Sequence, residues 1–160
     1  MDIFNEIKRD NILGVKELLE EIEDIASIKN ENKDSILRFA IKSGCSIEMF
    51  KLLTEYGANI FELDEEGVSL LDDAIKKGRL DIVVFLVEKG IDPSSTKRKS
   101  GFTPLMAAVS YGDEEITRYL LSLGVDTKGK DRFNYSAKDY AKMTGYKRFI
   151  NIIEEYEKKI

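Results

Sequence analysis

The sequence predicts an all-α fold, a solenoid of about five stacked helix–turn–helix repeats joined by finger-like connecting turns. Three observations lead to this prediction. Glycine recurs at a constant interval, a hydroxyl-bearing residue precedes each copy of a short apolar segment, and a second segment in each copy has apolar residues three and four positions apart. Because one helix pair cannot bury its own apolar face, such copies must stack to form a continuous core.

Glycine marks the period of the chain. One series, with steps of 34, 34 and 33 residues, comprises Gly44, Gly78, Gly112 and Gly145. A second series, with steps of 33 and 34, comprises Gly57, Gly90 and Gly124. Residue series that keep one phase over the chain indicate a repeated supersecondary unit.

Each repeat is expected to open with a short helix. The hydroxyl residues at its start are Ser35, Ser69, Thr103 and Ser136. A hydroxyl at this position can accept a hydrogen bond from a free backbone N–H of the first turn, which makes these residues predicted N-caps. Pro104 follows Thr103 at the first helical position, where a missing N–H costs nothing. The first glycine series then ends the helix with a left-handed residue.

A second helix follows in each repeat. Its apolar residues fall on one stripe because of their spacing; they include Met49, Leu52, Leu53, Ile82, Val83, Leu86, Val87, Ile116, Leu120, Leu121, Phe149, Ile152 and Ile153. The second glycine series ends this helix, and an extended connector leads to the next cap. Eleven residues separate Gly90 from Gly101, against ten from Gly57 to Gly67, so one extra residue is expected within 92–100.

Four stretches resemble the ankyrin repeat. Residues 101–112 contain its G-x-T-P-L-x-x-A core, and 119–126 and 51–59 are similar to its x-L-L-x-x-G-A-D ending, while 136–145 resemble a C-terminal repeat. The resemblance is close over about 30–156 and weaker over 2–29, where Asp10 replaces the glycine. It implies one domain, 1–160, with a degenerate N-terminal capping repeat (1–29), internal repeats (30–61, 62–94, 95–128) and a C-terminal capping repeat (129–160).

The chain departs from the family at the histidine that follows Thr-Pro-Leu. Met106 stands there, with Arg38, Asp72 and Lys138 assigned to the position in other copies. The resemblance therefore implies that the hydrogen-bond network this histidine builds between repeats is absent.

Composition excludes much of enzyme chemistry. The net charge is −5. Because the chain has no histidine, neither a Ser-His-Asp triad nor a Cys-His pair can form. A single cysteine, Cys45, rules out an internal disulfide and an ordinary zinc site, and we expect it to be an inert side chain. Adjacent carboxylates such as Asp72 and Asp73 diverge on a helix and do not converge on one atom. We expect no catalytic activity, no cofactor and no bound metal.

The chain is expected to be cytoplasmic. It contains no apolar run approaching the roughly 20 residues that cross a bilayer. Its first residues lack the basic start and apolar stretch of a signal peptide.

The resemblance also implies where a partner binds. Ankyrin proteins use a concave surface of finger tips and exposed positions of the first helices, and the matching positions here are Glu65, Glu66, Val68, Lys76, Lys77, Lys97, Lys99, Ser100, Phe102, Ser110, Tyr111, Arg132, Phe133, Tyr135, Met143 and Thr144.

Aromatic and basic residues are expected to gather at one end of that surface. They are Phe102, Tyr111, Phe133 and Tyr135, beside Lys97, Arg98, Lys99 and Arg132. Such residues make good binding anchors. Alternatively, Phe133 and Tyr135 pack beneath the fingers, and the basic run 97–99 neutralises the acidic finger 62–66.

These features predict a monomeric, non-enzymatic module that binds another protein, whose identity the sequence does not reveal. A scaffold is one form of this role. An alternative is an inhibitor or immunity-type regulator that occludes an enzyme or a toxin. A further alternative is nucleic-acid or phospholipid binding through residues 96–99, although the acidic net charge of −5 argues against nucleic-acid and membrane partners.

Overall fold

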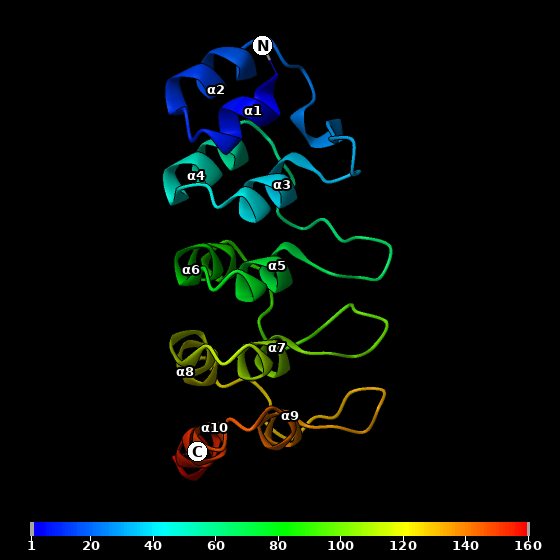
Figure 1. The fold of residues 1–160 in the computed structure, drawn as a ribbon, viewed down its shortest axis with the longest axis vertical. Helices are drawn as coiled ribbons and strands as arrows, with labels where there is room; N and C mark the ends of the chain where they lie inside the picture. Colours follow the sequence, from blue (N-terminus) through cyan, green and yellow to red (C-terminus); the bar gives the residue numbers. More distant parts are fainter. Residues whose placement is uncertain (1, 160) are drawn as a thin grey trace. The chain divides into compact units, whose positions relative to one another are not determined.

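A computed structural model describes residues 2–159, and helices account for almost all regular structure within them (Figure 1). The helices pair in chain order. The pairs are α1 (Ile3–Lys8) with α2 (Ile12–Leu19), α3 (Ile36–Ser43) with α4 (Ile47–Glu55), α5 (Leu70–Lys76) with α6 (Leu80–Glu88), α7 (Pro104–Ser110) with α8 (Glu114–Ser122), and α9 (Ala137–Thr144) with α10 (Arg148–Lys158). One 3-10 turn, η1, covers Ile25–Ser27. The predicted all-α repeat fold is confirmed.

The predicted N-caps are confirmed in all four repeats that have them. The hydroxyl of each accepts a hydrogen bond from the backbone N–H three residues on, at 3.1 Å for Ser35 and Ser69, 3.2 Å for Thr103 and 3.3 Å for Ser136. These bonds satisfy donors that the first turn of a helix leaves free. The local sequence therefore determines where each first helix begins.

The helix ends are also left-handed as predicted, including the one without glycine. Gly44 and Gly145 cap their helices with φ of 78° and 80°. Asp10 has φ of 55° at the matching place of the first repeat. Its carboxylate accepts hydrogen bonds at 3.0 Å from the backbone N–H and the hydroxyl of Ser46 at the start of α4. An aspartate tolerates this conformation and here adds a bond between repeats.

The residues in the position of the family's histidine are Arg38, Asp72, Met106 and Asp139, three residues after each cap. The assignment of Lys138 to this position is wrong by one residue. Lys138 instead forms an ion pair with Glu157, with 2.6 Å between Nζ and Oε1.

Other side chains stabilise the helix starts where the family's histidine is absent. Asp72 and Asp139 complete capping boxes by accepting bonds from the backbone N–H of Ser69 and Ser136, at 2.9 and 2.8 Å. The bonds from Ser136 also lower the pKa of Asp139. Asp72 additionally pairs with Arg98 of the next repeat, at 3.3 Å between Oδ2 and Nε. At Asp72 an ion pair between repeats thus stands where the family has the hydrogen-bond network of its histidine.

The chain divides into two compact units, one ending at Glu62 and the other beginning at Leu63. The boundary lies next to the predicted junction of the second and third repeats. In the first unit α1 packs on α3 and α2 on α4, and the rings of Phe4 and Phe39 meet edge to face with centroids 5.0 Å apart. The hydroxyl of Ser35 donates to Glu62 in the same unit.

In the second unit the first helices form one row and the second helices another. Helix α7 packs against both α5 and α9, while α8 packs against α6 and α10 (Figure 1). Because α7 has neighbours on both sides, every residue from Pro104 to Val109 is buried. Leu71 and Leu105, on α5 and α7, are each only 2% exposed.

Within residues 2–159 no helix combines the length and the apolar composition that crossing a membrane requires.

Candidate functional site

The second unit carries three finger-like turns, each leading into a first helix, at residues 63–69, 95–103 and 128–136. Two tips are organised by an aspartate. Oδ1 of Asp64 accepts hydrogen bonds from the backbone N–H of Glu66 and Val68, at 2.8 and 2.9 Å. Oδ1 of Asp131 does the same for Phe133 and Tyr135, both at 3.0 Å. These bonds fix how the tip residues are presented.

Neighbouring fingers are joined through their backbones. The N–H of Lys99 donates to the carbonyl of Glu66 at 3.0 Å, and the N–H of Arg132 donates to the carbonyl of Ser100 at 2.9 Å. The predicted contact residues of the three fingers are therefore held side by side.

The middle finger differs because Arg98 occupies the position of Asp64 and Asp131. The backbone carbonyl of Arg98 accepts a hydrogen bond from the N–H of Gly101, three residues later, at 3.0 Å. The carbonyls of the two aspartates each accept the same bond from the residue three positions later. The Asp92 carboxylate accepts a hydrogen bond from Ser94 N–H at 2.9 Å and so organises the turn that precedes this finger. Asp92 and Arg98 therefore bound the stretch that contains the extra residue. This stretch lies within the predicted range, 92–100.

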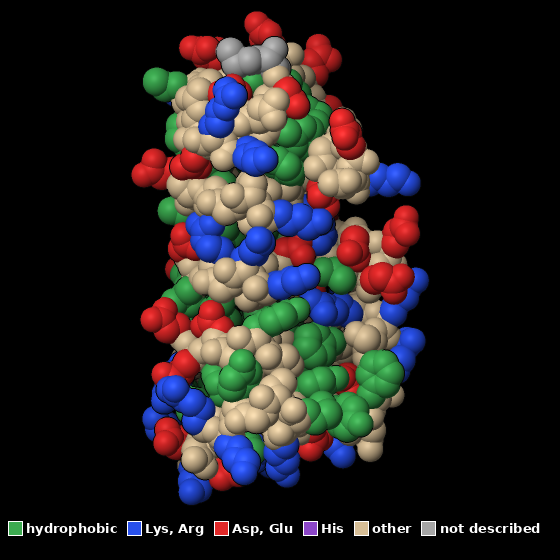
Figure 2. All heavy atoms as spheres, in the orientation of Figure 1, with side chains coloured by type: hydrophobic (Ala, Val, Ile, Leu, Met, Phe, Trp, Pro, Cys, Tyr) green, Lys and Arg blue, Asp and Glu red, His purple; other side chains and the backbone are tan. Residues whose placement is uncertain are grey.

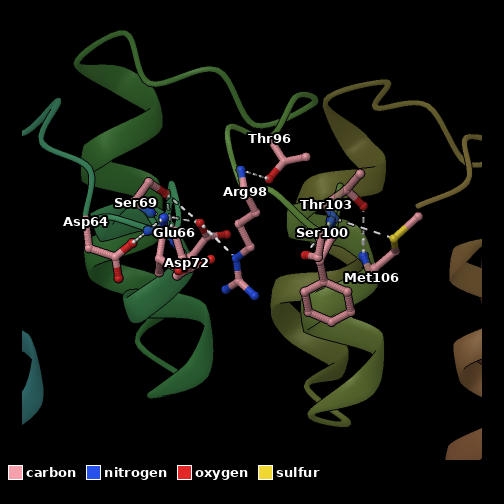
Figure 3. Close-up of polar contacts among 11 residues, drawn as sticks. Asp64, Glu66, Ser69, Asp72, Thr96, Arg98, Ser100, Thr103 and Met106 are labelled. Carbon is pink, nitrogen blue, oxygen red and sulfur yellow. Dashed lines mark hydrogen bonds and ion pairs between the residues drawn. The ribbon is translucent and has the colours of Figure 1, made fainter. Parts of the chain in front are cut away.

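The Arg98 side chain links two repeats (Figure 3). It lies between the Asp72 carboxylate and the Phe102 ring, whose centroid is 5.1 Å from the guanidinium carbon. Nε is buried and makes no hydrogen bond within residues 2–159, so the ion pair with Asp72 compensates its charge. Arg98 does not pair with the acidic finger, and Lys97 and Lys99 form no salt bridge within the same residues. The structure therefore gives no support to the alternative that the run 97–99 neutralises residues 62–66.

Three rings form what we call the aromatic cluster: Phe102, Tyr135 and Tyr140. The ring of Tyr140 on α9 meets Phe102 and Tyr135 edge to face, with centroids 5.2 and 5.8 Å apart. Its hydroxyl donates to Oδ2 of Asp131, so one carboxylate holds both the finger tip and this ring. Burial raises the pKa of Tyr140 to about 12, with the bond to Asp131 adding to the effect.

Sequence reasoning missed Tyr140 as a member of this cluster. The sequence feature that could have identified Tyr140 is its place on α9, one turn before the predicted contact residues Met143 and Thr144. Contact with Phe102, 38 residues earlier (140 − 102), depends on how α7 and α9 pack and is not a local property.

The apolar side chains of this surface are largely accessible. Phe133 is 66% exposed, Met143 54%, Tyr111 46% and Tyr135 41%. The alternative that Phe133 packs beneath the fingers is therefore wrong, and Tyr135 is only partly covered, by Tyr140. Figure 2 shows hydrophobic side chains gathered over the fingers and first helices of the second unit.

The other predicted contact residues fall into two groups. Those exposed to solvent are Glu65, Glu66, Lys76, Lys77, Lys97, Lys99, Arg132 and Thr144, and those partly buried are Val68, Ser100, Phe102 and Ser110. The hydroxyl oxygen of Ser110 is shielded from solvent and has no hydrogen-bond partner within residues 2–159. It is consequently a poor contact residue.

Replacing Tyr140 by phenylalanine should lower the free energy of unfolding by about 1–2 kcal/mol, because Asp131 loses the hydroxyl that donates to it. Urea unfolding near neutral pH measures this loss. Tyr56→Phe is the control, since the Tyr56 hydroxyl makes no hydrogen bond within residues 2–159 and the ring is 37% exposed. Equal stability of Tyr140→Phe and wild type would contradict the role assigned to the bond.

The same pair of proteins should differ in pH dependence. Because the pKa of Tyr140 is raised from 10.0 to about 12 in the folded protein, its hydroxyl contributes stability that is complete below pH 10. That contribution is lost as the pH rises through 12. The stability difference between wild type and Tyr140→Phe should therefore shrink over this interval.

Comparison with known proteins agrees with the repeat geometry. A family profile described as ankyrin repeats (many copies) matches residues 71–121. A putative ankyrin repeat protein of fowlpox virus is 30% identical over 141 residues, which are 88% of this chain and 32% of the viral protein. A putative ankyrin repeat-containing protein of Treponema pallidum is 29% identical over 119 residues, 74% of this chain and 39% of that protein.

A human relative carries a functional name. Protein phosphatase 1 regulatory subunit 27 is 31% identical over 86 residues, which are 54% of this chain and 55% of that protein. The chain thus spans between about a third and just over half of the length of these three relatives.

Ankyrin repeats generally serve as protein–protein interaction modules and are typically non-enzymatic. The repeated helix pairs, their caps and fingers, the profile match and the named relatives agree, and this chain belongs to the ankyrin-repeat family.

Proposed function

We propose that this chain binds another protein, without catalysis, through the finger tips and first helices of the second unit. The observation that carries the proposal is the exposure of Phe133 and Met143 on a finger and a helix held in place by internal bonds. A rigid surface loses little conformational entropy when it binds, so more of the contact energy appears as affinity.

The partner contacts would be made by the sixteen residues predicted above, apart from Ser110. The exposed apolar and aromatic side chains serve as anchors, and the charged residues around them form a polar rim. We further propose that the chain acts as a cytoplasmic monomer built from five repeats in one domain, with the first and last repeats as caps.

A regulatory role is the second candidate. The observation that favours it is the similarity to a protein named as a regulatory subunit of protein phosphatase 1. A module of this kind would act by covering part of an enzyme or toxin surface.

Nucleic-acid or phospholipid binding through residues 96–99 has weaker support. Arg98 is engaged with Asp72 and Phe102, and the Thr96 hydroxyl accepts from the Arg98 N–H at 3.1 Å. Only Lys97 and Lys99 of this run remain exposed. Two lysines provide few phosphate contacts.

Affinity capture from the native host tests the proposal. We expect Phe133→Ala/Met143→Ala to lose a protein that the wild type retains, because truncating exposed anchors removes contacts with the partner alone. Phe102 and Tyr135 are less suitable targets, since both support Tyr140.

The matched control is Leu13→Ala/Leu123→Ala, which truncates side chains that are 74% and 42% exposed and lie outside the fingers and first helices. Circular dichroism should be the same for all three proteins. Capture of one unchanged set of proteins by wild type and both variants would show that the surface is wrongly assigned.

A further inference from the structure

We infer that the finger surface of the second unit selects a protein segment in which an apolar side chain is flanked by aspartate or glutamate. The inference rests on the proposed function and specifies the chemistry of the partner. It depends on the exposed apolar residues, on the cations around them, and on the internal engagement of the neighbouring carboxylates.

The apolar component is already organised without a partner. Phe133 is 66% exposed although its backbone N–H is held by Asp131 at 3.0 Å. Tyr135 leaves 41% of its surface accessible and packs on Tyr140. A segment with an aliphatic or aromatic side chain can cover these rings without reorganising the finger.

The cations of this surface are exposed to solvent. Lys97, Lys99 and Arg132 lie on the two adjacent fingers and form no salt bridge within the described part of the chain, 2–159. The backbone bonds at Lys99 and Arg132 fix the positions of their main chains. Lys97 interacts electrostatically with Asp92, but none of the three cations has to give up a salt bridge to bind an incoming carboxylate, so the cost in existing interactions is small.

Four carboxylates on or beside these two fingers are engaged internally. Asp72 pairs with Arg98, Asp131 accepts from Tyr140 and two backbone N–H groups, and Asp139 completes a capping box. Asp92 accepts from Ser94 and Ser95, and these bonds lower its pKa. The charges left free on the two fingers are therefore predominantly positive.

The acidic finger limits the length of the positive surface. Asp64, Glu65 and Glu66 are exposed, and the carbonyl of Glu66 accepts from the N–H of Lys99. A nucleic-acid strand continuing along the fingers would meet these carboxylates, and the net charge of the chain is −5. A short acidic segment of a protein avoids this repulsion, so it is the favoured occupant.

Selection from a phage-displayed library of random twelve-residue peptides tests the inference. The immobilised proteins are wild type, Lys97→Glu/Lys99→Glu/Arg132→Glu, and a control with the same charge change in the first unit, Lys8→Glu/Lys16→Glu/Lys29→Glu. All six side chains are exposed. The milder variant Lys97→Gln/Lys99→Gln/Arg132→Gln covers the case in which charge reversal disturbs folding.

We expect wild type and the control to enrich peptides with an apolar residue beside aspartate or glutamate, and the reversed variant to enrich basic peptides instead. A synthetic copy of the most enriched wild-type peptide should bind the glutamine variant about tenfold more weakly than wild type. Its affinity for Phe133→Ala should fall by a similar factor.

The remaining outcomes separate the two proposals. Enriched peptides that depend on Phe133 but show no acidic bias would overturn the inference and leave protein binding intact. Enrichment that is indifferent to Phe133 and to all three cations would overturn both. Binding of a fluorescent oligo-thymidine at low salt, lost in the glutamine variant, would identify a nucleic-acid surface and overturn the acidic-peptide assignment.

Discussion

Replacing Gly67 by alanine should lower the free energy of unfolding by about 2–4 kcal/mol, because two effects act together. The residue has φ of 81°, where an L side chain is strained, and an added Cβ would lie 1.9 Å from the carbonyl oxygen of Lys97. Backbone atoms cannot withdraw as the end of a flexible side chain can. The two neighbouring fingers would have to separate, which would also strain the bond between Lys99 and Glu66. Urea unfolding measures the loss.

Gly124→Ala is the matched control for this prediction. Gly124 has φ of 79°, but an added Cβ would meet no atom within 4 Å. Its loss should therefore be limited to the backbone term, about 1–2 kcal/mol. Losses of the same size at both positions would mean that the close approach of the fingers contributes nothing to stability.

Truncating Leu105 to alanine should cost about 2–5 kcal/mol of unfolding free energy, since it leaves a cavity in a packed core. Leu105 is 2% exposed on α7, which is covered by α5 on one side and α9 on the other. Leu71→Ala on α5, equally buried, should cost a similar amount. Denaturant unfolding of both variants provides the measurement.

Leu123→Ala serves as the comparison, because this side chain is 42% exposed and lies just after α8. We expect its effect to stay within about 0.5 kcal/mol, the usual range for surface substitutions. A loss below about 1 kcal/mol for Leu105→Ala would place this leucine outside the core and contradict the stacking of α5, α7 and α9.

The stability and binding predictions depend on the same interactions, which hold the fingers of the second unit in place. Backbone bonds between fingers, the ion pair of Asp72 with Arg98 and the bond of Asp131 with Tyr140 hold exposed aromatic rings in defined positions. Each interaction joins residues of different repeats or of a finger and its helix. The binding surface consequently depends on the same contacts that keep the repeats stacked.

Several details of that surface could not be anticipated. The sequence indicated an aromatic group near Phe102, but the ring that connects the group is Tyr140. Arg98 was expected beside other basic residues on the surface, whereas it is partly buried between Asp72 and Phe102. Both differences arise because contacts between repeats join residues distant in sequence, 26 positions apart for Asp72 and Arg98 and 38 for Phe102 and Tyr140.

Repeat number, helix starts and helix ends follow from local chemistry. A hydroxyl before an apolar segment caps a helix wherever the chain folds, and a residue that tolerates positive φ ends it, so Ser35, Ser69 and Gly44 could be placed from spacing alone. Periodic apolar residues further require that neighbouring repeats stack.

Tertiary structure decided which side chains of the fingers are available to a partner. Phe133 and Arg98 occupy fingers of similar composition, yet one is 66% exposed and the other pairs with a buried carboxylate. Hydrogen bonds and ion pairs act only at short range, so their partners are determined once the helices have packed and brought distant residues within a few ångströms.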